Sequence, residues 1–273
     1  CLDVVDGSEL VDLAASKGLV TQVGYHYRFV GAFNEAKRLL DAKVLGRVHH
    51  VRGEAYGPVV LRPKGSTWRA SRNEGGGCLY DYASHAIDIV TYLLGSPVGV
   101  GGTVLNKVFS RDVEDEVYST LYFADGMTGQ IAANWSDESY RRMSTQVTIW
   151  GTNGKMIVDR QEIKLFVRNA SDSTIPVPPG WSIRYTTDFH SDVGYYLRGE
   201  EYSAQIDYFL RSIAERRKDN VSSFASALQT DRVIAMMLQN ANQSRPDSQV
   251  QLTEKSGNSA ARRLFERIKG AIA

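Results

Sequence analysis

Hydrophobic positions follow a helical period near both ends of the chain and a period of two through its middle. Apolar residues spaced three and four apart predict amphipathic helices at 6–17, 33–45, 199–217 and 224–242. Alternation predicts a long strand from Arg47, then strands at Val98–Lys107, Glu116–Ala124, Gly129–Trp135, Thr145–Gly151, Lys155–Asp159 and Ile163–Arg168. Asp125-Gly126 and Asn153-Gly154 join neighbouring strands as hairpins, so we expect a mostly antiparallel sheet.

The first 24 residues predict a helix followed directly by a short buried strand. Asp6 and Glu9 have capping-box spacing, and Gly18 ends the helical pattern before the strand at Leu19–Gly24. Because a helix leading into a buried strand is half of an α/β crossover unit, we expect the first strand of that unit upstream of Cys1.

The stretch Gly75–Gly95 combines three glycines with a helix that carries titratable side chains. Asp81, His85 and Asp88 are spaced to share one stripe of this helix, and its apolar side is Ala83, Ala86, Ile87, Val90, Leu93 and Leu94. A carboxylate beside an imidazole can fix the tautomer of that imidazole and serve acid/base catalysis. The alternative is an exposed Asp–His pair of small energetic value, and for Asp88 we favour a cap or salt-bridge role.

Composition excludes several classes of function. The chain has 273 residues, 42% hydrophobic and 23% charged, with a net charge of +1. This balance argues against nucleic acid or an anionic membrane as the main partner. The two cysteines, Cys1 and Cys78, form no disulfide framework and indicate a reducing, cytoplasmic compartment. No segment has the apolar length of a membrane span, and the N-terminus is no signal peptide.

Other candidate sites are weaker. Gly75-Gly76-Gly77 is not a dinucleotide fingerprint, and we expect these glycines to let a ligand approach the backbone. Arg28, Arg69 and Trp68 could bind a polyol or a phosphate, although a single Arg is more often in a surface salt bridge. Asp81 and His85, with His190, have no metal-site spacing, so we predict no metal.

One face of the predicted sheet is unusually aromatic. In the strand at 116–124, Val117, Leu121 and Phe123 point one way, and Tyr118, Thr120 and Tyr122 point the other. An open face of this composition favours contact with another subunit over contact with water.

The segments that carry a family likeness are GGGCLYDYASHAIDIVTYLLG (75–95), VGYHYRF (23–29), the Trp68-Arg69 pair, the sheet region at 113–126 and 150–155, and Glu201–Phe209. Their order and spacing resemble the Gfo/Idh/MocA oxidoreductases, the group of glucose–fructose oxidoreductase and inositol dehydrogenase. The resemblance runs from Cys1 to about Asn242.

The resemblance implies an α+β fold, a large open, mostly antiparallel mixed sheet with helices on one face. It divides the matched part of the chain into a dinucleotide-binding (Rossmann) remnant at 1–24 and a substrate, catalytic and oligomerisation domain at 25–245. The remnant would consist of the last helix and the last strand of that Rossmann domain. Residues 246–273 lie outside the resemblance, and their own pattern predicts a polar linker followed by a basic amphipathic tail helix. The implied partners are a sugar or polyol and further copies of the chain, as a homodimer or homotetramer through the open sheet face.

The family resemblance also implies the chemistry. His85 and Asp81 would be catalytic, Arg28, Trp68, Arg69 and Tyr82 would bind substrate, and the cofactor would be NAD or NADP. A catalytic Lys and the glycine-rich cofactor loop would lie upstream of Cys1, so the chain alone is expected to be inactive.

Two alternatives stay open. One is a ligand-binding or oligomerisation module of the same fold that has lost hydride transfer. The other uses a transient ketone for elimination or glycoside cleavage.

Overall fold

A computed structural model describes residues 1–59, 67–170, 173–189, 195, 199–217 and 219–243. The described residues form one eight-stranded sheet in the order β2-β3-β4-β1-β5-β6-β7-β8. The strands are β1 (Val48–Tyr56), β2 (Gly99–Asn106), β3 (Glu116–Tyr122), β4 (Thr128–Asn134), β5 (Ser144–Gly151), β6 (Gly154–Asp159), β7 (Glu162–Val167) and β8 (Gly180–Tyr185). All neighbours are antiparallel except β1 and β4, which run parallel, so the predicted mixed sheet is confirmed.

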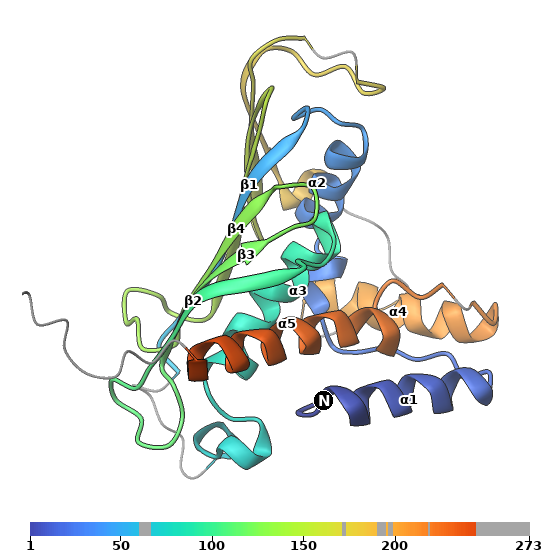
Figure 1. Ribbon diagram of the computed structural model, residues 1–273. Coiled ribbons are helices and arrows are strands. Elements are labelled where there is room, and N and C mark those ends of the chain that lie inside the picture. Colours follow the sequence, from blue (N-terminus) through green and yellow to red (C-terminus); the bar gives the residue numbers. More distant parts are fainter. Residues whose placement is uncertain (60–66, 171–172, 190–194, 196–198, 218, 244–273) are drawn as a thin grey trace, which may run out of the picture.

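Helices cover one face of this sheet, and Figure 1 shows the opposite face bare. The α-helices are α1 (Val4–Ser16), α2 (Gly31–Asp41), α3 (Ser84–Leu94), α4 (Glu200–Ala214) and α5 (Phe224–Gln243). Shorter helical turns are η1 (His26–Phe29), η2 (Trp68–Ala70), η3 (Arg72–Glu74), η4 (Leu79–Ala83) and η5 (Thr186–Phe189). Helix α3 packs on β1 and β5 at the centre of the sheet, while α5 packs on β2 and α1 packs on α5. The predicted α+β architecture with helices on one face is confirmed.

Alternation decides which side chains face the helices. In β1, Val51, Gly53 and Ala55 are buried, whereas the side chains between them lie on the open face. A shift of register between Val48 and His50 leaves His49 exposed. In β3 the predicted division also holds, because Val117 and Leu121 are buried while Tyr118 and Tyr122 are exposed.

Three predictions at element boundaries are wrong. Leu19–Gly24 has no strand partner among the described residues, and Val23 instead donates its N–H to the Ser222 carbonyl. The N-cap of α1 is Asp3 and not Asp6, since the Asp3 carboxylate accepts from the Val5 N–H at 2.6 Å. Strand β8 is missing from the predicted strands, because it is an edge strand in which Trp181, Ile183 and Tyr185 are all exposed and the alternation is weak.

None of the described helices has both the length and the apolar character needed to cross a membrane. Both cysteines are free thiols, with Cys1 exposed and Cys78 buried. The tail helix predicted beyond residue 245 lies outside the described residues.

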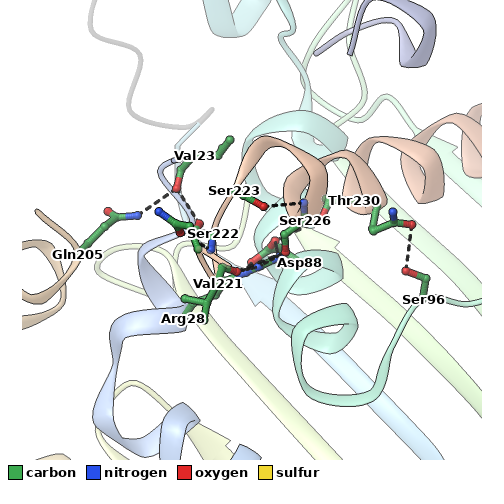
Figure 2. Close-up of polar contacts among 12 residues, drawn as sticks. Val23, Arg28, Asp88, Ser96, Gln205, Val221, Ser222, Ser223, Ser226 and Thr230 are labelled. Carbon is green, nitrogen blue, oxygen red and sulfur yellow. Dashed lines mark hydrogen bonds and ion pairs between the residues drawn. The ribbon is translucent and has the colours of Figure 1, made fainter. Parts of the chain in front are cut away.

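A buried ion pair joins η1, α3 and α5 behind the candidate site (Figure 2). The Arg28 guanidinium donates to both carboxylate oxygens of Asp88, at 2.5 and 2.9 Å, and both side chains are 1% exposed. Arg28 also donates to the Val221 carbonyl and the Ser226 hydroxyl, and Thr230 donates to Asp88. The structure thus confirms the salt-bridge role predicted for Asp88.

Arg28, predicted as a substrate-binding residue, belongs to this internal network. Its side chain is buried, and its guanidinium N–H groups donate hydrogen bonds to Asp88, Val221 and Ser226. A guanidinium held in this way is a structural group, because a ligand would have to displace buried partners.

We predict that Arg28→Ala destabilises the chain by about 3–5 kcal/mol, since it leaves the Asp88 carboxylate buried without its counter-charge. Chemical denaturation measures this loss. Lys37→Ala is the matched control, because Lys37 forms a partly exposed pair with Asp41 and should cost only about 0.5 kcal/mol. A loss for Arg28→Ala similar to that of the control would contradict the prediction.

Candidate active site

The segment before α3 is held by Glu114, a carboxylate from the loop before β3. Glu114, which is 2% exposed, accepts from the Leu79 backbone N–H at 3.0 Å and from Arg72 at 3.0 Å. The Cys78 N–H donates to the Glu114 backbone carbonyl. Glu114 therefore satisfies the free N–H groups that the start of a helix presents, and the position an anionic ligand would take is filled by the protein's own carboxylate.

Gly76 and Gly77 serve internal packing, and our prediction that they let a ligand approach the backbone is wrong for these two. A Cβ on Gly76 would lie 2.3 Å from the Arg69 carbonyl oxygen. A Cβ on Gly77 would lie 2.2 Å from Glu114 Oε1, and Gly77 also has φ = +108°. The space beside both glycines is occupied by the chain itself, so they form no cradle for a cofactor phosphate.

A π-helical turn at Leu79–Ala83 leads into α3 and carries Asp81 and Tyr82. Such turns replace i→i+4 bonds with wider ones and are frequent at functional sites. The Ser84 N–H donates back to the Leu79 carbonyl, and the regular helix then begins with Ser84 and His85. The turn and the helix together place Asp81 and His85 next to different neighbours.

Three aromatic rings of the loop before α2 surround His85. The ring centroids of Tyr25, His26 and Tyr27 lie 5.8, 5.3 and 5.7 Å from that of His85, all in edge-to-face geometry. The His85 side chain keeps part of its surface exposed, whereas its Nδ1 atom is buried and has no hydrogen-bond partner among the described residues. His85 is thus a fixed imidazole with one buried and one accessible side.

The surroundings keep this imidazole neutral. Burial, followed by repulsion from the nearby His26, lowers the pKa of His85 to about 3. An imidazole is favoured in its neutral form when it is taken out of water without a negative partner. At neutral pH, His85 can accept a proton and does not carry one beyond its single ring N–H.

Asp81 has a different partner from the one the spacing predicts. Its carboxylate accepts from Arg69 Nε at 2.8 Å, and no hydrogen bond joins it to His85 in the described part of the chain. Arg69 also lies over the Trp68 ring, with its guanidinium carbon 4.9 Å from the ring centroid. Asp81, Arg69 and Trp68 therefore form one group, in which Trp68 is 43% exposed and Arg69 is partly exposed.

Tyr82 lies under the site. It is 3% exposed and makes an edge-to-face contact with Trp135. A Cβ on Gly57 would meet the Tyr82 hydroxyl oxygen at 2.6 Å, so this glycine makes room for the phenol. The structure brings Asp81, Trp68, Arg69 and Tyr82 together near the start of α3, and it places Arg28 in the network behind it.

Several residues of the site are not among those that the sequence predicts. They are Tyr25, His26, Tyr27, Arg160, Glu201 and Tyr202. Tyr202 stacks on His26 with centroids 4.8 Å apart, and Glu201 pairs with Arg160 at 2.7 Å. The signal available was the density of aromatic side chains in 25–29, which is unusual for a surface loop. His190 lies outside the described residues, and those residues contain no cluster of three or more metal-ligating side chains.

Comparison with known proteins confirms the family resemblance. Residues 33–157 match the family model of the GFO/IDH/MocA C-terminal domain. Levoglucosan dehydrogenase of Pseudarthrobacter phenanthrenivorans is 25% identical over 193 residues, which are 61% of this chain and 49% of that protein. The NAD⁺-dependent scyllo-inositol 2-dehydrogenase of Bacillus subtilis is 26% identical over 174 residues, 62% of this chain and 48% of that protein.

A solved structure has the same fold. Levoglucosan dehydrogenase in complex with NADH and levoglucosan superposes with a TM-score of 0.74 at 22% identity, covering 89% of this chain and 70% of that one. The chain spans about half the length of the curated relatives it matches.

We predict that His85 makes the chain less stable in mild acid. The unfolded chain protonates this residue near pH 6.5, whereas the folded chain does so only at about 3, so the unfolding free energy falls as pH drops below 6.5. The contribution reaches about 1.4 kcal/mol per pH unit. The measurement is chemical denaturation of the native chain and of His85→Asn at a series of pH values, from pH 7 down to the lowest pH at which both are folded. The unfolding free energy of His85→Asn should fall less steeply with decreasing pH than that of the native chain.

The control for this experiment is His49→Asn, because His49 is exposed on β1. It should keep the slope of the native chain. Equal slopes for the native chain and His85→Asn would show that His85 does not lose its proton on folding.

Proposed function

Because residues 33–157 form a GFO/IDH/MocA C-terminal domain, we propose that the chain is the substrate-binding and catalytic part of an NAD(P)-dependent oxidoreductase. The reaction is hydride transfer between a nicotinamide and the hydroxyl or keto carbon of a sugar, cyclitol or related compound. The observation that carries the proposal is the His85 imidazole, which is neutral, enclosed by three rings and accessible from one side.

His85 is the proposed proton acceptor. Oxidation of an alcohol removes a hydride from carbon and a proton from oxygen, and a neutral imidazole beside the hydroxyl can take that proton. The low pKa keeps His85 free of the proton before substrate binds. Negative charge that develops on the substrate oxygen raises the affinity of the imidazole for the proton at the moment of transfer. The same group returns the proton in keto reduction.

The group around Asp81 is the proposed substrate wall. Asp81 orients the Arg69 guanidinium, whose remaining N–H groups can donate to hydroxyl oxygens of a polyol. The exposed Trp68 ring offers an apolar surface to the C–H groups of a sugar ring. In this proposal Asp81 acts on the substrate through Arg69 and through its own charge, and Tyr82 supports the floor of the site.

The described residues do not fit the dinucleotide part of such a cofactor. Arg69 and Glu114 occupy the space beside Gly76 and Gly77, and the Glu114 carboxylate accepts the Leu79 N–H at the start of the helical segment. The proposal therefore assigns proton transfer and substrate contact to these residues and derives no step through NAD or NADP. This same observation favours the second candidate function, a module of the family fold that binds a ligand without hydride transfer.

The open face of the sheet is the proposed contact between copies of the chain. The register places Tyr122, Thr128, His50, Trp150, Lys155, Phe166 and Trp181 in one row across the sheet. Trp181 and Tyr122 are 61% and 48% exposed, and no described helix covers this face (Figure 1). A broad surface with aromatic side chains is typical of an interface in a homodimer or homotetramer.

We predict that His85→Ala, in a protein that joins this chain to a cofactor-binding domain, lowers the turnover of sugar or cyclitol oxidation by about 100-fold or more, because the hydroxyl proton then has no acceptor. The assay supplies NAD or NADP with a panel that includes levoglucosan and scyllo-inositol, and follows formation of the reduced nicotinamide. The control is His49→Ala on the exposed side of β1. A change smaller than about threefold would remove His85 from the mechanism.

Two other results would redirect the proposal. Saturable sugar binding without turnover, by a chain that also fails to bind NAD or NADP, would select the binding module. Release of an elimination or cleavage product, identified by mass spectrometry, would replace oxidation with chemistry through a transient ketone.

We predict that Tyr122→Glu lowers the mass of the assembly in sedimentation equilibrium, because it places a charge in the row of aromatic side chains that forms the proposed contact. Leu13→Glu on α1 is the control, since Leu13 is exposed to a similar degree on the helical side. A native chain that sediments as a monomer, or a Tyr122→Glu variant of unchanged mass, would contradict an interface on this face.

A further inference from the structure

A second imidazole lies against the proposed catalytic one. His26 is 8% exposed and is enclosed by rings from three elements: Tyr27 of η1 at 4.3 Å, Tyr202 of α4 at 4.8 Å, and His85 of α3 at 5.3 Å between centroids. The Tyr202 contact is a stack with an interplanar angle of 24°, and the His85 contact is edge-to-face at 65°. The ring of His26 is therefore clamped, and one of the groups it touches is His85.

An ion pair also acts on His26. Glu201, 4% exposed, lies 2.7 Å from the Arg160 guanidinium, which is 39% exposed. Burial, which is the largest effect, and Arg160 lower the pKa of His26, whereas the Glu201 carboxylate raises it, and the net shift is downward. At neutral pH His26 is therefore uncharged, and its neighbours include this charged pair from α4 and the β6–β7 turn as well as His85.

We propose that His26 is a positioning residue of the acid/base centre, whose clamped imidazole fixes the ring of His85 and, when His26 carries a proton in acid, opposes a second proton on His85. The role assigned to His85 rests on the proposed function, but the contact between the two imidazoles does not. His26 does not itself touch the reacting atoms in this proposal, and it acts through His85 alone.

His26 constrains His85 first by its shape. Its ring fills the space beside His85, so the His85 ring has fewer orientations available, and a base must point at the proton it removes. His26 also acts on His85 by charge. A proton on either imidazole raises the cost of a proton on the other, as for any two like groups in a desolvated site. Since His85 Nδ1 has no described hydrogen-bond partner, neighbouring rings are what hold the side chain.

Other titratable groups face His26, and the variants must leave them in place. They are Tyr27, His85, Arg160, Glu201 and Tyr202. His26→Phe keeps a ring of similar size against Tyr202 and removes only the imidazole nitrogens. It therefore separates the electrostatic role of His26 from its role in packing.

The experiment is a nitrogen–proton NMR titration of His85 in the full chain without cofactor. We expect His26→Phe to raise the pKa of His85 by about 0.5–1 unit and to keep the nuclear Overhauser contacts of His85 with Tyr25 and Tyr27. We expect His26→Ala to raise the pKa and also to change those contacts. His49→Phe is the control and should alter neither.

An unchanged or lowered pKa of His85 in His26→Phe overturns the proposal. The proposal is also overturned if His85 of this variant takes up no proton at the lowest pH at which the variant is folded. A residue that only packs would give this result, because Phe packs as well as His. If His26→Ala does not fold, His26→Phe decides alone. The titration tests the coupling of the two imidazoles and needs no turnover. An active His85→Ala variant would overturn the proposed function and would leave that coupling untouched. The two proposals can therefore fail separately.

Discussion

The position of α3 depends on two buried carboxylates. One lies on α3 and binds residues of distant segments, and the other comes from a distant segment and binds the start of the helical stretch. Asp88 on α3 binds Arg28 of η1 and Thr230 of α5, while Glu114, in the loop before β3, binds the Leu79 N–H at the start of the helical segment. Either group would be costly to bury alone, so each is stable only when its partner is in place. The helix between these two points has little freedom, and His85 lies between them.

The same arrangement explains why the loop at 25–29 meets His85. Arg28 enters the interior to reach Asp88, and the residues just before it must then lie along α3. Tyr25, His26 and Tyr27 consequently present their rings to His85, which stands almost one turn before Asp88. The ion pair is thus a structural feature with a direct effect on the candidate site, although it contributes no group to the chemistry.

Charge is separated within the site. The carboxylate of Asp81 is neutralised by Arg69 at the partly exposed end, and the imidazole of His85 is surrounded by aromatic rings at the enclosed end. A carboxylate directly paired with the imidazole would favour its protonated form, whereas this arrangement favours the neutral form. The site therefore combines a polar wall suited to hydroxyl groups with a base that is free to accept a proton.

The sequence by itself determined the elements whose signal is local. Alternation located seven of the eight described strands, Asp-Gly and Asn-Gly placed the turns, and the order of the motifs predicted the resemblance to the family whose C-terminal domain model matches residues 33–157. Tertiary structure decided which groups are partners. Asp81 and His85 are four residues apart, yet Asp81 binds Arg69, twelve residues away, and Asp88 binds Arg28 across sixty. Spacing along a helix predicts which side chains share a stripe of that helix. The partner of a charged side chain depends instead on which opposite charge the fold brings within hydrogen-bond distance, and that distance in space cannot be read from spacing along the chain.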